Sequence, residues 1–171
     1  MATQRTADAS PHFAGPAYGV GVLFVVFPLL DVVVQAWPIV LGNPTWRYGA
    51  VGIGANYTIS LVFGMWLLCY TAGRQLHRRT LVVLAILALL MAVASLVAIL
   101  GFVLDGLQIR PSVPRDPARA LWMFDAGMQK ALVKYAASAL VLAWLAVSSR
   151  RALRDLPGRE DAPRLVRDSK G

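Results

Sequence analysis

The chain has 171 residues, of which 57% are hydrophobic and 15% charged, with a formal net charge of +8. Ordinary soluble proteins contain roughly 45–50% apolar and about 25% charged residues, so this composition disfavours a water-soluble domain. The single cysteine, Cys69, excludes an intrachain disulfide, a cysteine-rich metal site and paired-thiol redox chemistry. We attribute the positive charge to membrane orientation and anionic lipid headgroups, and expect no nucleic-acid partner.

Residues 1–16 are polar, small and interrupted by two prolines, which predicts an irregular N-terminal lead. The lead lacks the basic start and short apolar run of a signal peptide, so we expect no cleavage. A first transmembrane helix is predicted over 17–41, with a kink at Pro28. The following GNPTWRYG predicts a tight turn, and we expect interfacial aromatic side chains there, namely Trp37, Trp46 and Tyr48.

A second transmembrane helix is predicted over 50–72, and its first half carries small and polar residues. Gly52 and Asn56 are four residues apart, as are Ser60 and Gly64, so each pair shares a helix face. Such faces are typical of close helix packing in lipid, here with an interhelical hydrogen bond from Asn56. The other interpretation is a polar substrate path.

The strongest signal is the third predicted span, 80–104, which contains no charge and no proline. At about 1.5 Å per residue it is long enough to cross a hydrocarbon core of about 30 Å. A helix that is apolar on every face needs lipid or complete coverage by protein, which a chain of this length can hardly supply.

The pair Asp116-Pro117 predicts the start of a fourth helix that continues to about residue 154. This helix is longer than a bilayer core, so we expect its first turns, which contain Trp122, to form an amphipathic stub outside the membrane. The span itself is predicted over 128–148. Residues 150–171 form a basic cytoplasmic tail that is either a flexible extension or a docking segment.

Lysine and arginine counts predict the orientation. With four spans, eleven of these residues fall on the side of both termini and four on the other side, while Lys130 and Lys134 fall within the fourth span. This bias predicts cytoplasmic termini. We therefore expect an all-α integral membrane protein, a four-helix transmembrane bundle of the bacterial inner membrane. Basic contacts to headgroups or partners are predicted at Arg74, Arg78, Arg79, Arg150, Arg151 and Arg154.

Four polar residues lie at matched depths in the first and fourth spans. Asp31 and Lys134 are each fourteen residues from the assumed cytoplasmic ends at Ala17 and Ser148, and Gln35 and Lys130 are each eighteen. Because these helices are antiparallel, we expect two side-chain contacts between them, Asp31 with Lys134 and Gln35 with Lys130. An intramembrane ionisable residue calls for a partner. These contacts predict either a structural ion pair that holds the first helix to the fourth or a proton- or ion-coupled site. Alternatively, Lys130 snorkels to the outer interface and Asp31 contacts something else, such as a partner subunit.

The sequence contains no catalytic or nucleotide-binding signature. His77 is a weak candidate to ligate a porphyrin or chlorin at the membrane edge, and no cofactor is required by the sequence. By exclusion, the leading hypothesis is a non-enzymatic accessory subunit of a larger membrane complex, with energy-transducing or photosynthetic assemblies as candidate hosts. The alternative is a small transporter or ligand-binding membrane protein that uses Asp31, Asn56, Lys130 and Lys134. A third is an enzyme of lipid or quinone chemistry.

Overall fold

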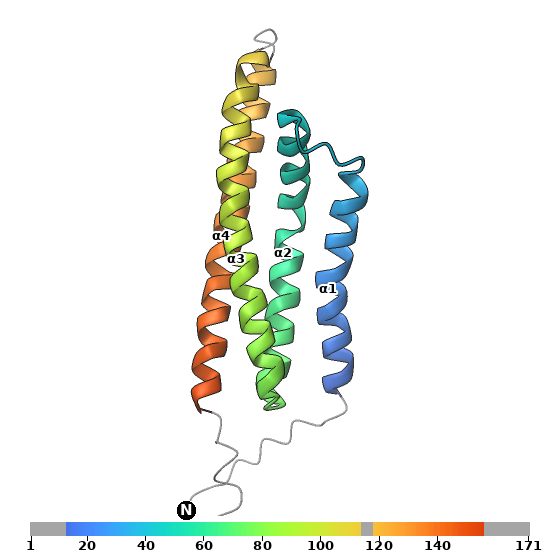
Figure 1. Ribbon diagram of the computed structural model, residues 1–171, viewed down its shortest axis with the longest axis vertical. Helices are drawn as coiled ribbons and strands as arrows, with labels where there is room; N and C mark the ends of the chain where they lie inside the picture. Colours follow the sequence, from blue (N-terminus) through green and yellow to red (C-terminus); the bar gives the residue numbers. More distant parts are fainter. Residues whose placement is uncertain (1–12, 114–117, 156–171) are drawn as a thin grey trace, which may run out of the picture.

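The computed structural model describes residues 13–113 and 118–155, which form a bundle of four long helices (Figure 1). These are α1 (Ala14–Gln35), α2 (Pro44–Arg74), α3 (Arg78–Ile109) and α4 (Ala118–Asp155), and the short 3₁₀ helix η2 (Arg110–Ser112) follows α3. All four long helices are long and apolar enough to cross a membrane. This confirms the predicted all-α bundle of four candidate membrane spans. Residues 1–12, the predicted helix start at Asp116-Pro117 and most of the predicted tail lie outside the described residues.

The connection between α1 and α2 differs from the prediction at both of its ends. α1 stops at Gln35, six residues before the predicted boundary, because a residue that precedes proline disfavours helical backbone and Trp37 precedes Pro38. α2 starts six residues early. The Asn43 side chain accepts hydrogen bonds from the backbone N–H groups of Thr45 (2.9 Å) and Trp46 (3.3 Å), so Asn43-Pro44 is a helix cap.

The other helices extend past their predicted spans. α3 continues from the apolar run through Asp105 to Ile109. α4 ends at Asp155, close to the predicted helix end at about residue 154, so the first residues of the predicted tail are helical. Figure 1 shows α3 and α4 projecting beyond α1 and α2 at the end of the bundle where α3 ends and α4 begins. The first residue of α1 and the last residue of α4 lie at the opposite end of the bundle.

The buried core belongs to α2, α3 and α4. One apolar cluster is built around Met65, Leu81 and Leu142, and a second around Phe102 and Tyr135. In Figure 1 α1 stands beside α2, on the side away from α3 and α4. Only 11% of the most apolar stretch of α1 is buried, against 28–39% in the other three helices. The architecture is therefore a three-helix core with one helix attached to α2.

Two glycines allow α1 and α2 to approach closely. A methyl group at Gly64 would lie 2.9 Å from the carbonyl oxygen of Gly21, and one at Gly21 would lie 2.8 Å from the Leu68 side chain. Small residues are what lets helix backbones pack this closely in lipid. The packing interpretation of the Ser60–Gly64 face is thus supported by the structure.

Candidate functional site

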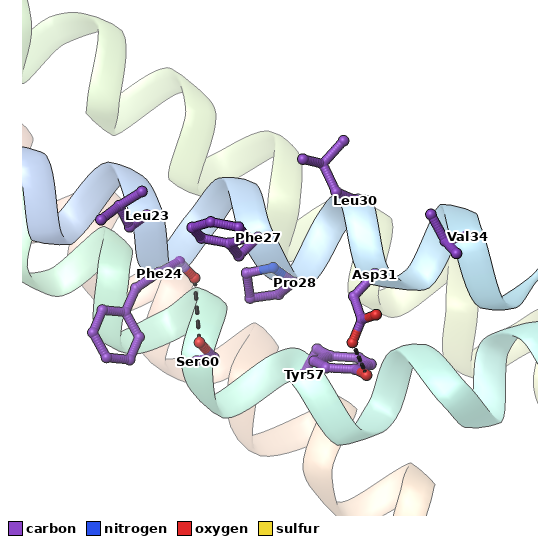
Figure 2. Close-up of a pocket in the computed structure, with 9 residues that line it drawn as sticks. All are labelled: Leu23, Phe24, Phe27, Pro28, Leu30, Asp31, Val34, Tyr57 and Ser60. Carbon is purple, nitrogen blue, oxygen red and sulfur yellow. Dashed lines mark hydrogen bonds between the residues drawn. The ribbon is translucent and has the colours of Figure 1, made fainter.

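An open groove runs along the outside of α1 and α2, and its volume is about 610 Å³ (Figure 2). Most of its lining is apolar and comes from α1, while Tyr57 and Ser60 come from α2. Asp31 points from α1 towards α2, where its carboxylate accepts a hydrogen bond from the Tyr57 hydroxyl. The same hydroxyl accepts a hydrogen bond from Gln35 Nε2 at 2.6 Å. Both Asp31 and Gln35 remain exposed.

Ser60 compensates for the proline in α1. Pro28 has no backbone N–H to donate to the carbonyl four residues earlier, which belongs to Phe24. The Ser60 hydroxyl donates to that carbonyl at 3.3 Å, as Figure 2 shows. In lipid an unsatisfied carbonyl is costly, so this contact also fixes α1 on α2.

A second cavity, of about 350 Å³, lies between α2, α3 and α4 on the other side of α2. We call it the lysine pocket, because Lys130 and Lys134 line it one helical turn apart. Lys134 Nζ donates to Asn56 Oδ1 at 2.9 Å, which confirms an interhelical hydrogen bond from Asn56. The remaining lining is aromatic or small except for Met123, and consists of Tyr48, Gly52, Ala55, Phe102, Met123, Phe124, Gly127 and Ala131.

The predicted pairing of Asp31 with Lys134 is wrong. Asp31 contacts Tyr57 and Lys134 contacts Asn56, and among the described residues neither forms an ion pair. Gln35 likewise bonds to Tyr57 and does not reach Lys130. The predicted equal depth of Asp31 and Lys134 agrees with the structure, since their contacts, Tyr57 and Asn56, are consecutive residues of α2. The prediction failed because it assumed that the first and fourth helices are neighbours, whereas α2 lies between α1 and α4.

The structure contains two ion pairs, within its described part, that the sequence analysis missed. The Arg47 guanidinium donates from Nε to Asp105 Oδ2 (3.0 Å) and from Nη2 to Oδ1 (2.5 Å). Its Nη1 also donates to the Leu41 carbonyl at 2.7 Å, so Arg47 ties the α1–α2 loop to α3. Arg110 and Asp125 form a similar two-bond pair between η2 and α4, at 3.1 and 2.9 Å. The sequence feature that could have indicated an ion pair is Asp105, a charged residue directly after the long apolar run.

The predicted interfacial aromatics divide into two groups. Trp37 and Trp122 are about 70% exposed, so they are free to face headgroups. Trp46 Nε1 instead donates to the Ala36 carbonyl at 2.9 Å, which joins the start of α2 to the end of α1. Tyr48 is stacked between Phe102 and Phe124, with ring centroids 4.3 and 5.1 Å apart. These two residues therefore hold helices together.

The six predicted basic contacts all lie at the end of the bundle where α2 ends, α3 begins and α4 ends, and all are exposed. His77 precedes α3 at this end. Its Nδ1 lies 3.1 Å from the Tyr18 hydroxyl, and the two rings are stacked. The contact occupies one ring nitrogen of His77, and ligation of a porphyrin or chlorin stays a prediction.

The described helices define an all-α bundle with four candidate membrane spans, an apolar groove that contains the Asp31 carboxylate on one side of α2 and a pocket with two lysines on the other. No protein-family model, curated protein or solved structure matches this chain. Its function is therefore argued from its own residues.

Proposed function

We propose that this protein is a non-enzymatic subunit of a larger membrane complex and that α1 contacts its partner. The observation that carries this proposal is Asp31, an exposed carboxylate on the helix with the least burial. Its hydrogen-bond partner among the described residues, Tyr57, is neutral and leaves the charge uncompensated. A charged side chain in the hydrocarbon costs roughly 2.5–3.5 kcal/mol on insertion scales, so it calls for a partner.

The groove around Asp31 supports a helical partner. Its outer wall consists of apolar side chains of α1, including Leu23, Phe27, Leu30 and Val34, which stand on both sides of the carboxylate along the helix (Figure 2). A transmembrane helix of another subunit, with a lysine, arginine or hydroxyl side chain at this level, would cover the apolar wall and neutralise Asp31 together. Energy-transducing and photosynthetic complexes are the host classes we favour.

The arginine-rich end of the bundle supports an orientation. Lysine and arginine are enriched in cytoplasmic segments, so we place this end, and with it both chain termini, in the cytoplasm of a bacterial inner membrane. Anionic headgroups of the cytoplasmic leaflet are the lipid partners of these arginines. The projecting ends of α3 and α4, which include the predicted amphipathic stub, then stand on the opposite side.

The test is gentle extraction of the protein from its own membrane, followed by native mass spectrometry and an absorption spectrum. We expect a defined assembly in which this chain and other chains occur in a fixed ratio. Asp31→Asn should lower the assembled fraction, while the control Asp125→Asn should not, because Asp125 is already paired with Arg110. A visible absorption band that disappears in His77→Ala would identify a bound porphyrin or chlorin.

A photo-crosslinking amino acid locates the contact. At Val34, which is 71% exposed on α1, it should label one identified subunit of the same assembly, and at Leu90, 61% exposed on α3, it should label lipid. A monomer or a homo-oligomer free of other chains contradicts the proposal, as does an Asp31→Asn variant that assembles normally.

A small proton- or ion-coupled transporter is the second candidate. The observation in its favour is the chain of hydrogen bonds from Gln35 through Tyr57 to Asp31, at the same level of α2 as the Asn56–Lys134 contact. For a transporter, Asp31→Asn should abolish flux in proteoliposomes and leave a homo-oligomer intact.

A further inference from the structure

The lysine pocket contains two cations that have no counter-charge within the part of the chain that the structure describes. Lys130 and Lys134 form no ion pair among the described residues, and Lys130 has no hydrogen-bond partner there either. The carboxylates on the neighbouring parts of α3 and α4 are already bound, Asp105 by Arg47 and Asp125 by Arg110. Two like charges one turn apart repel each other, so the pocket favours an anionic ligand.

The level of the pocket in the bundle matches a lipid headgroup. Lys130 precedes Arg150, at the arginine-rich end of the same helix, by 150 − 130 = 20 residues. At about 1.5 Å per residue this is about 30 Å, the thickness of the hydrocarbon core. With Arg150 taken as one hydrocarbon boundary, Lys130 lies at the opposite boundary and Lys134 one turn inside it. Lysine side chains at this depth extend their ammonium groups to the headgroups.

The lining of the pocket suits a phosphate that carries acyl chains. Lysine ammonium groups act as point charges for phosphate. With Asn56 Oδ1 occupied by Lys134, the amide NH₂ of Asn56 remains available as a donor. The stacked rings of Phe102, Tyr48 and Phe124 form an apolar wall beside these groups. Glycine and alanine at four other lining positions leave open space, and at Gly127 a methyl group would meet nothing within 4 Å.

We propose that the lysine pocket is a binding site for an anionic phospholipid, with the lipid phosphate between Lys130, Lys134 and Asn56. The lipid belongs to the leaflet at the end of the bundle that is opposite the arginines. Its acyl chains leave the pocket into the bilayer. This site lies on α2, α3 and α4, so it is separate from the groove proposed for the partner subunit.

The experiment uses the full-length protein in nanodiscs with a phosphatidylglycerol that carries a photo-activatable group on an acyl chain near the glycerol. We expect labelling of α4 within the pocket, mapped by peptide mass spectrometry. The corresponding phosphatidylcholine probe should label the same peptide much less, because its head carries no net charge. Equal labelling by the two probes contradicts the proposal.

Variants test the two lysines. Lys130→Gln should weaken labelling about fivefold and Lys130→Gln with Lys134→Gln about 30-fold, which corresponds to about 1 kcal/mol per lysine near an anionic surface. The matched control is Arg150→Gln with Arg151→Gln, which removes two charges from the other end of α4 and should leave this peptide labelled. Lys130 is exposed and forms no side-chain hydrogen bond or ion pair among the described residues, so the single variant keeps the test valid if the double variant unfolds. Undiminished labelling of Lys130→Gln overturns the proposal.

Free phosphate is the other source of the same anion. Excess inorganic phosphate should not displace the lipid probe, because the apolar lining contributes only to a ligand with acyl chains. If inorganic phosphate competes as well as unlabelled phosphatidylglycerol does, the pocket is a site for the free ion and the lipid assignment is wrong.

Discussion

The pair formed by Arg47 and Asp105 should be among the most sensitive points of the fold. Asp105 is 5% exposed and accepts both of its side-chain hydrogen bonds from Arg47. Arg47→Met leaves this buried carboxylate without a counter-charge, which should lower the free energy of unfolding by about 3–5 kcal/mol. Asp105→Leu should cost less, about 2 kcal/mol, since Arg47 is one-third exposed and keeps its bond to the Leu41 carbonyl.

The double variant distinguishes the cost of leaving one charge unpaired from the cost of losing the whole ion pair. Arg47→Met with Asp105→Leu replaces the ions with apolar side chains, so it should be about as stable as Asp105→Leu alone. Equilibrium unfolding of the purified protein in lipid–detergent micelles, followed by circular dichroism, measures all three changes. The control is Arg110→Met, whose pair with Asp125 also has two hydrogen bonds but is half exposed and should contribute much less to stability. The reasoning is refuted if Arg47→Met costs no more than Arg110→Met, or if the double variant loses the sum of the two single losses.

Three further variants follow from local geometry, and the same unfolding measurement checks each. Gly64→Ala should lose about 1–3 kcal/mol, because the new methyl meets backbone of α1 at 2.9 Å, while Gly101→Ala, with nothing within 4 Å, should lose none. Equal effects at the two glycines contradict this packing. Ser60→Ala should lose about 1 kcal/mol, because a carbonyl of α1 loses its donor, and the loss should vanish in a Pro28→Ala background, where the backbone N–H is restored. Leu76 has a φ of 55°, a left-handed conformation that is strained for leucine and relaxed for glycine. Leu76→Gly should therefore stabilise the α2–α3 turn by about 1 kcal/mol, and a destabilised variant would contradict this strain.

Depth along a helix was predictable from this sequence, and lateral order was not. Counting residues from the predicted helix ends placed Asp31 and Lys134 at one level, and their contacts with consecutive residues of α2 agree with that level. The count carries no information about which helices are neighbours. In four antiparallel spans the first and fourth can be adjacent or separated, and packing between glycines and side chains decides between the two. Here Gly21 and Gly64 hold α1 on α2, away from α4.

Helix ends were predictable where one chemical signal dominated. α3 begins at Arg78, two residues before the start of the predicted apolar span at residue 80. The α1–α2 connection contains two prolines with opposite effects on helix formation. Pro38 ends a helix and Pro44 begins one, and the difference depends on whether the preceding residue can accept hydrogen bonds from the next backbone N–H groups. Asn43 does so and Trp37 cannot, which a count of turn-forming residues does not detect.

The position of α2 explains how one chain can keep an acid and two bases in the membrane without neutralising them internally. Consecutive residues of an α-helix point about 100° apart, so Tyr57 faces Asp31 while Asn56 faces Lys134. Asp31 and Lys134 thus each have a neutral hydrogen-bond partner from α2, and the helix itself keeps these opposite charges apart. A chain under selection for stability alone would gain by letting such charges meet or by replacing them with apolar residues. Their separation leaves one side of α2 acidic and the other basic, which is the arrangement required if a protein subunit binds one side and an anionic lipid the other.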